Sequence, residues 1–106
     1  MKNTKRINHW QRIIDNVLAV YERLDKSCNA AIEIGAMNSD GPLYDAIWSG
    51  FSRLLKHIDH EGWISWHIWD NDCGKNSFSA KCSSMRRSVK IKTARDLAKL
   101  IAKSEE

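Results

Sequence analysis

The spacing of hydrophobic residues changes at Gly62, and this change constrains the fold more than any other feature of the sequence. Before Gly62, apolar residues recur every three or four positions, which places them on one stripe of a helix. After Gly62 the spacing becomes two, which is typical of a strand. The two alternating sets are Ile64, Trp66 and Ile68 on one side and Trp63, Ser65, His67 and Trp69 on the other. The pattern predicts helices first and a small sheet later.

Helices are predicted on both sides of a short break before Gly62. The first runs from about Asn8 to Ser27. Asn29–Asn38 fits a short helix or a buried extended segment about equally well, and we interpret it as a short helix. A further helix begins at Pro42, because proline at the first helical position gives up only a backbone donor that has no partner there. Gly62 supplies the left-handed residue that commonly ends a helix.

Extended segments and a final helix are predicted after Gly62. The extended segments are the aromatic strand Trp63–Trp69, Phe78–Cys82 and Ser88–Lys92, with a turn over Asp70–Asn76. Thr93 is the predicted N-cap of the final helix, and Asp96 completes a capping box with it. The predicted fold is therefore α+β, with two to three helices packed on a small antiparallel sheet of two or three strands and a helix at the C-terminus.

Length and composition predict one domain over residues 1–106. A chain of 106 residues buries roughly two thirds of the surface that it exposes when unfolded. Its residues are 42% hydrophobic and 28% charged, close to the globular average. No apolar run approaches the roughly 20 residues needed to cross a bilayer, so no membrane contact is expected. The three cysteines are odd in number and irregularly spaced, which predicts reduced thiols and a cytoplasmic location.

Positive charge is concentrated in two segments. The formal net charge is +4 at pH 7, but seven basic residues and no acidic one lie from Gly74 to Arg95. The seven are Lys75, Lys81, Arg86, Arg87, Lys90, Lys92 and Arg95. Residues 1–14 add four more basic side chains without an acid. An acidic partner would therefore meet two positive patches rather than a uniform field.

Candidate metal ligands and acids are present without a recognisable arrangement. The candidate ligands are His57, His60, His67, Cys73 and Cys82. Their spacing matches no standard zinc site, in which ligands come in close pairs at both ends. Carboxylates at the end of a strand, such as Asp70 and Asp72, can hold Mg²⁺ or share acid and base roles, but at a turn they more often accept backbone hydrogen bonds. No metal, cofactor or catalytic residue is expected, and a small metal-dependent enzyme ranks third among the functions.

The basic stretch and the tryptophans favour a binding function. Lysine and arginine neutralise phosphates and tryptophan stacks on exposed bases, so this segment supports nucleic-acid binding. Tryptophan and arginine are also enriched in the hot spots of protein interfaces, where cations steer an acidic partner. Because both sides of the aromatic strand carry tryptophan, one set is expected to serve the core and the other to meet a partner. The predicted partner-binding residues are Trp63, Trp69, Lys81, Arg86, Arg87, Lys90 and Lys92.

The aromatic segment also resembles a known motif. The run Gly-Trp-Ile-Ser-Trp-His-Ile-Trp-Asp-Asn-Asp-Cys-Gly at residues 62–74 resembles small uncharacterised proteins of bacteriophages and prophages, in which an aromatic strand ends in an acidic-Asn-Asp-x-Gly turn. The resemblance extends to Gly41–Ala46 and Ile91–Leu97. The chain departs from the family between Phe78 and Lys90, which is unusually basic and rich in serine. The family offers no catalytic residues to carry over.

This resemblance implies a class of function. Small accessory proteins of mobile elements commonly act by binding a host protein, including defence machinery such as CRISPR effectors or restriction enzymes. The leading hypothesis is a non-enzymatic phage or prophage accessory protein in the host cytoplasm that inhibits a bacterial defence complex, as anti-CRISPR and anti-restriction proteins do. The alternative is a basic accessory protein that binds nucleic acid with the same residues.

Overall fold

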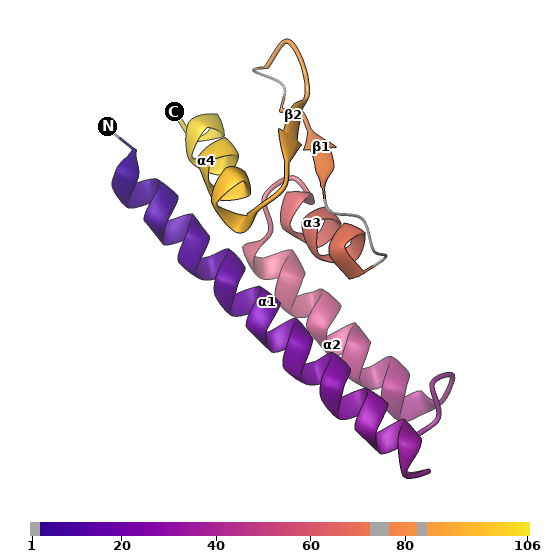
Figure 1. The fold of residues 1–106 in the computed structure, drawn as a ribbon. Helices are drawn as coiled ribbons and strands as arrows, with labels where there is room; N and C mark the ends of the chain where they lie inside the picture. The colour runs from indigo at the N-terminus through magenta and orange to yellow at the C-terminus, as the bar shows by residue number, and fades with distance from the viewer. Residues whose placement is uncertain (1–2, 73–76, 83–84) are drawn as a thin grey trace. The chain divides into compact units, whose positions relative to one another are not determined.

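The computed structural model describes residues 3–72, 77–82 and 85–106 of the chain. Its elements in chain order are α1 (Thr4–Glu33), α2 (Pro42–Ile58), α3 (Trp63–Asp72), β1 (Phe78–Ala80), β2 (Val89–Ile91) and α4 (Ala94–Ser104) (Figure 1). Four helices and a two-stranded antiparallel sheet within the described residues, with a helix at the C-terminus, confirm the predicted α+β class. None of the described helices is both long and apolar enough to cross a membrane.

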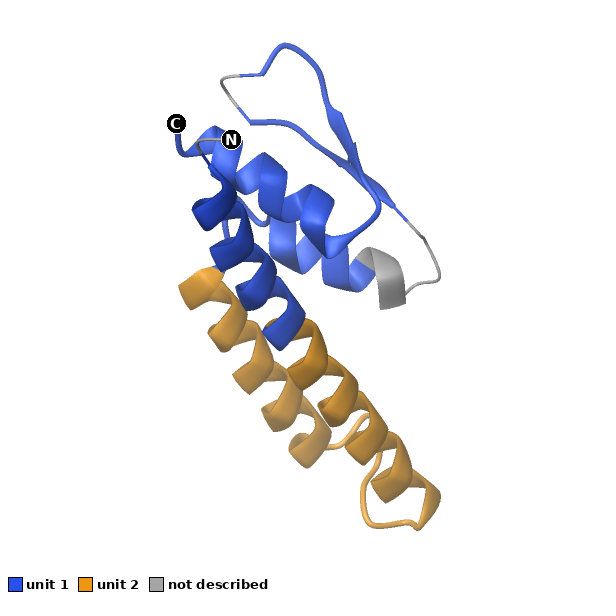
Figure 2. Ribbon diagram, turned by 60° about the vertical axis from the view of Figure 1, so that its left-hand side comes forward, with its two compact units in different colours: residues 1–16, 59–106 blue, residues 17–58 orange. Residues whose placement is uncertain are grey.

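The chain divides into two compact units. Unit 1 comprises Met1–Asn16 and Asp59–Glu106, and unit 2 comprises Val17–Ile58 (Figure 2). The N-terminal part of α1 thus belongs to unit 1 and the rest of α1 to unit 2. That residues 1–106 form a single domain stays a prediction.

Unit 2 is a helical hairpin of α1 and α2. Its buried residues are Val17, Tyr21 and Cys28 of α1 and Phe51 and Leu55 of α2. The helix α1 continues past Cys28 to Glu33. The prediction of a separate short helix over Asn29–Asn38 is therefore wrong. Gly35 ends α1 with a φ of +78°, a left-handed conformation that glycine adopts without steric cost. The predicted start of α2 at Pro42 is confirmed.

The aromatic segment that was predicted to be a strand is helix α3. Trp63, Ile64 and Ile68 are buried, and Trp66, which shared a strand face with Ile64 and Ile68, is 63% exposed. This is the burial pattern of a helix. The helix is started by Asp59, whose carboxylate accepts hydrogen bonds from the backbone N–H of Ile64 at 2.7 Å and of Ser65 at 3.1 Å. These donors have no partner inside a first helical turn, so an acidic side chain that accepts from them stabilises a helix start.

The corner between the helix and the sheet also differs from the prediction. Gly62 has the expected left-handed conformation, with a φ of +78°, but it lies just before α3 instead of ending α2, which stops at Ile58. Asp70–Asp72 lie in the last turn of α3, where a reverse turn had been predicted. The remainder of that turn, residues 73–76, lies outside the described residues.

The two later extended segments do form a sheet. β1 and β2 pair in antiparallel register, with Phe78 opposite Ile91, Ser79 opposite Lys90 and Ala80 opposite Val89. In β2, Ile91 is buried and Lys90 is exposed, as the alternating sequence predicts, but Val89 on the side of Ile91 is 37% exposed; in β1, Ala80 is buried. The hairpin therefore has an apolar inner face and a polar outer face.

The capping box predicted for α4 is confirmed. The Thr93 side chain accepts from the backbone N–H of Asp96 at 3.1 Å, and the Asp96 carboxylate accepts from the backbone N–H of Thr93 at 3.3 Å. These bonds satisfy backbone donors that the helix itself leaves unpaired. The buried residues of α4 are Leu97, Ala98, Leu100, Ile101 and Ala102. With Ile14, Trp63, Ile64, Ile68 and Ile91 they form much of the core of unit 1.

Candidate functional site

The predicted partner-binding residues fall into two groups. Five are exposed cations, namely Lys81, Arg86, Arg87, Lys90 and Lys92, which we call the cationic hairpin surface. Trp69 is half-buried, and Trp63 is 5% exposed, so the prediction that the Trp63 side chain faces a partner is wrong. The helix is the reason, because adjacent residues of a helix can both turn inwards, as Trp63 and Ile64 do, whereas a strand sends them to opposite faces.

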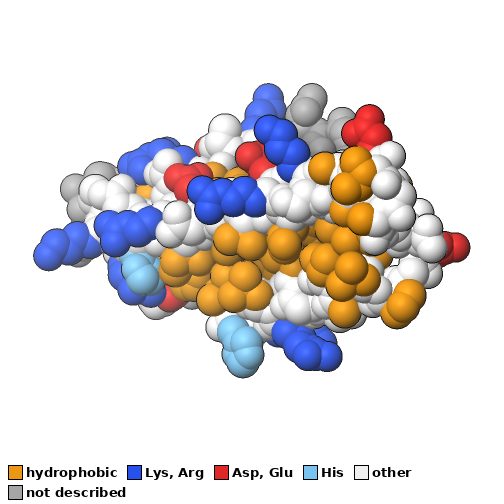
Figure 3. Space-filling view, turned by 90° about the horizontal axis from the view of Figure 1, so that it is seen from below, with side chains coloured by type: hydrophobic (Ala, Val, Ile, Leu, Met, Phe, Trp, Pro, Cys, Tyr) orange, Lys and Arg blue, Asp and Glu red, His pale blue; other side chains and the backbone are white. Residues whose placement is uncertain are grey.

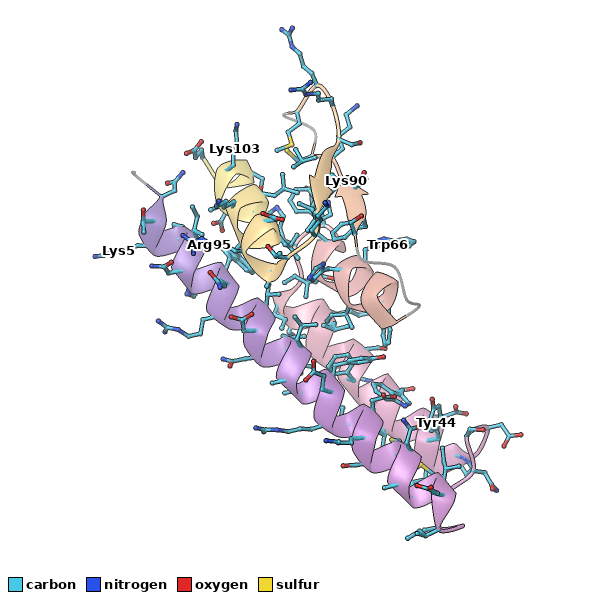
Figure 4. All side chains as sticks on the ribbon, in the orientation of Figure 1. Lys5, Tyr44, Trp66, Lys90, Arg95 and Lys103 are labelled. Carbon is cyan, nitrogen blue, oxygen red and sulfur yellow. The ribbon has the colours of Figure 1, made fainter. Side chains whose placement is uncertain are left out.

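The cationic hairpin surface is built by the alternation of the strands. Lys90 and its partner Ser79 are exposed opposite each other, while Ile91 packs inwards (Figure 4). Arg86 and Arg87 lie in a bend before β2 and are exposed. Charge therefore covers the outer face of the hairpin and the chain that leads into β2. Whether these side chains contact a partner stays a prediction.

Trp66 is the aromatic residue that the alternating pattern misplaced. Its side chain projects from α3, and it lines an open groove of about 540 Å³ together with Glu61, Phe78 and Lys81 (Figure 4). An indole ring offers a large apolar surface and a donor N–H, and it attracts cations over its face. The groove thus places an exposed aromatic ring next to Lys81 of the cationic hairpin surface. Helical spacing would have identified Trp66 as exposed, because the buried Ile64 and Ile68 each lie two positions from it and therefore about 160° away around the helix.

A row of cations on α4 extends the positive surface of unit 1. Arg95, Lys99 and Lys103 are exposed and follow one another at intervals of four residues, which places them on one side of the helix. The guanidinium of Arg95 donates to Gln11 Oε1 at 2.7 Å and to Asn8 Oδ1 at 3.3 Å. Arg95 is therefore held by α1, whereas the row as a whole borders an open cavity of about 870 Å³.

A serine, a histidine and a glutamate also meet in unit 1. Ser104 Oγ lies 2.8 Å from His60 Nε2, and Glu61 Oε2 lies 3.7 Å from the same nitrogen. In a hydrolytic triad the carboxylate holds the other ring nitrogen and orients the imidazole towards the serine. The Ser104 hydroxyl also lies within donating distance of the Ile101 carbonyl, at 2.7 Å, and its single proton serves only one of these two partners at a time. The contact ties His60 to α4, and Glu61 lies near the same ring nitrogen as Ser104 and not near the nitrogen that a triad carboxylate holds.

Glu105 connects the beginning of α1 to the end of α4. Arg6 Nη2 donates to Glu105 Oε2 at 2.8 Å and to Oε1 at 2.9 Å, and Trp10 Nε1 donates to Oε1 at 2.9 Å. The hydrogen bonds from Arg6 are the largest cause of a pKa below the ordinary value for Glu105. Partial burial opposes this effect, and the Trp10 indole and the charge of Arg6 add to it.

This lowered pKa predicts a loss of stability in acid. A carboxyl whose folded-state pKa lies below its unfolded value stabilises the fold above the unfolded pKa, and that contribution is lost as the pH falls through the folded pKa. Glu105→Gln should therefore flatten the decrease in unfolding free energy between about pH 5 and about pH 3 in urea titrations. Glu106→Gln is the matched control, because Glu106 accepts from the neutral Asn3 amide. Equal slopes for Glu105→Gln and the original chain would contradict the assignment.

The histidines and cysteines do not converge on a metal site within the described residues. There, no group of three His, Cys, Asp or Glu side chains is placed to hold a metal ion. The His60 ring packs 4.9 Å from Trp63, and the buried His67 ring lies 5.7 Å from Phe78, as measured between ring centroids. Cys82 is buried, and Cys73 lies outside the described residues.

Comparison of the chain with protein-family models, curated proteins and solved structures gave no match.

Proposed function

We propose that this chain is a non-enzymatic binding protein that captures an acidic protein partner with the cationic hairpin surface and Trp66. The observation that carries the proposal is the 63% exposure of Trp66 in a groove beside Lys81. Leaving an indole in water forgoes the free energy of burying a large apolar ring. A partner that covers Trp66 recovers that free energy, while the surrounding cations favour an acidic surface on the partner.

The phage resemblance of residues 62–74 makes the proposed partner a host protein. A component of a CRISPR or restriction complex that presents an acidic surface would fit. This part of the proposal rests on analogy between small accessory proteins of mobile elements.

Nucleic-acid binding is the second candidate, and the same groove supports it. An exposed indole provides a stacking platform for a base, and the lysines of the hairpin supply phosphate contacts. The two candidate functions differ in their sensitivity to nuclease: a captured protein is retained after nuclease treatment, whereas a captured nucleic acid is lost. The described residues contain no group of His, Cys, Asp or Glu side chains that could hold a metal ion for a metal-dependent reaction.

The proposal is tested by capture from bacterial lysate on the immobilised chain, with and without nuclease. We expect a retained protein that survives nuclease treatment, and Trp66→Ala should lower its apparent affinity by roughly 30-fold, since truncating a hot-spot residue costs about 2 kcal/mol. Trp66→Phe, which keeps an aromatic ring, is the matched variant and should retain most of the affinity. If nuclease abolishes retention of the partner, nucleic-acid binding replaces protein binding as the proposed function. If Trp66→Ala retains as much partner as the original chain, Trp66 is not part of the interface.

A further inference from the structure

Unit 2 carries an exposed aliphatic surface on its helical hairpin. We call it the aliphatic face, and it consists of Val20 and Leu24 of α1 and Leu43, Ile47, Leu54 and Ile58 of α2. Leu43 is 55% exposed, Leu54 is 41% exposed and Val20 is 36% exposed. The other three side chains are half-buried. Isolated apolar residues are normal on a surface, but a row of them on adjacent helices marks an interaction site.

Helical phase places these residues on one side of the hairpin. Three of the six members directly precede a residue of the inward-facing row: Val20 precedes Tyr21, Ile47 precedes Trp48 and Leu54 precedes Leu55. A shift of one residue turns a side chain by about 100° around the helix. Because the two helices run antiparallel, as Figures 1 and 2 show, this same shift sends both rows to the same side of the pair. Figure 3 shows hydrophobic side chains gathered on such a face.

Gly50 lies in the row of α2 between Ile47 and Leu54. It is exposed, and a Cβ atom added to it would meet nothing within 4 Å. Its backbone is helical, so neither local crowding nor a left-handed conformation within the chain requires glycine there. Glycine in a helix interior is less stable than alanine. A small residue in an apolar row allows the backbone of a docked helix to approach closely. A docked helix would thus explain a glycine that the isolated hairpin does not require.

The borders of the aliphatic face are cationic. The adjoining row of α1 carries Arg23, and the adjoining row of α2 carries Arg53 and His57, all of them exposed. The other members of these rows within unit 2 are uncharged, and the acids of unit 2 lie on other sides of the helices. Figure 3 shows Lys, Arg and His side chains at the edges of a hydrophobic area. A second copy of this chain would bring like charges together across the contact, which is unfavourable.

The aromatic residues of unit 2 lie away from this face. Tyr21, Tyr44, Trp48 and Phe51 pack against one another, with ring centroids 5.4 to 6.2 Å apart. Surfaces that insert into the membrane interface are typically rich in tryptophan or phenylalanine together with lysine. The face of unit 2 is aliphatic, and this composition suits a helix that packs into the groove between two others.

We propose that unit 2 binds an amphipathic helix of a partner protein whose aliphatic seam is flanked by acidic residues. The helix would lie along the aliphatic face to complete a three-helix bundle, with its backbone close to Gly50 and its carboxylates beside Arg23 and Arg53. This contact uses a surface of unit 2 and is independent of the cationic hairpin surface of unit 1.

The test uses the full chain and two synthetic helical peptides of about 18 residues. Both peptides carry the same leucine seam, and the flanks are glutamate in one and lysine in the other. Titration with fluorescence anisotropy should show that the glutamate peptide binds at least tenfold more tightly than the lysine peptide, with an affinity that weakens as salt increases. Leu54→Asp should lower the affinity for the glutamate peptide by at least tenfold.

A second pair of variants keeps the test independent of folding. Gly50→Leu places bulk in the open space and should block the peptide while raising the thermal midpoint of the chain, whereas Gly50→Ala should raise the midpoint and spare most of the binding. Failure to bind either peptide, equal binding of both, or full binding by Gly50→Leu would overturn the proposal. So would a dimer that Leu54→Asp dissociates, or tighter binding to phosphatidylglycerol vesicles than to the glutamate peptide.

Discussion

Replacing Arg86 and Arg87 together with glutamate is expected to lower partner capture by on the order of 100-fold, because like charges brought together at an interface cost several kcal/mol. Both side chains are exposed beside β2, so reversing them places negative charge where an acidic partner would approach. Association should slow more than dissociation accelerates, since exposed charges act mainly on encounter. Surface plasmon resonance on the captured partner at two salt concentrations measures both rates.

The control for this double variant is Lys26→Glu with Lys56→Glu, which makes the same change in net charge on exposed residues of unit 2. It should leave capture nearly unchanged, because both lysines belong to unit 2, whereas the cationic hairpin surface belongs to unit 1. Thermal unfolding should differ little among the three proteins, as exposed substitutions usually change stability by less than about 0.5 kcal/mol. Equal losses in both double variants would mean that net charge, and not the hairpin, attracts the partner.

The features that were predicted correctly are encoded by residues close together in the chain. Proline at the start of α2 and the box formed by Thr93 and Asp96 are complete within one helical turn. The alternation around Lys90 is likewise local, and the β1–β2 pair follows it. In each case the chemistry that selects the structure can be read from a few adjacent residues.

The features that were missed depend on contacts that the spacing of apolar residues does not encode. Residues 63–69 carry apolar side chains at positions that satisfy a strand and a helix alike, and spacing cannot distinguish the two in so short a segment. Asp59 helps to settle the structure by accepting hydrogen bonds from the first turn of α3. The contact between Arg6 and Glu105 spans nearly the whole chain. No local pattern predicts a pair so far apart in the sequence.

The candidate site changed with the helix. A strand would have put Trp63 and Trp69 on a face opposite Trp66, and the exposed pair would have met the partner. The helix instead buries Trp63 and exposes Trp66, while leaving the five cations of the hairpin on the surface. The charged part of the predicted surface thus stays accessible, and its aromatic part moves to a different residue.

Trp63→Ala is expected to lower the free energy of unfolding by about 3 to 5 kcal/mol, the usual cost of truncating a buried large aromatic residue. Trp63 is 5% exposed, and its ring packs against His60. Trp66→Ala should change the free energy of unfolding by less than about 0.5 kcal/mol, because most of the Trp66 side chain is already in water. Urea unfolding followed by far-ultraviolet circular dichroism compares the two variants on one scale.

Trp63→Ala and Trp66→Ala serve as controls for each other, because each replaces one tryptophan of the same helix with alanine. If residues 63–69 formed a strand with Trp66 facing the core beside Ile64 and Ile68, the larger loss would fall on Trp66→Ala. A small effect at Trp66 also gives the capture experiment its meaning. If Trp66→Ala stays folded and no longer holds the partner, it has lost a contact with the partner. Which of Trp63→Ala and Trp66→Ala has the lower free energy of unfolding therefore decides whether Trp66 acts at the surface or within the core.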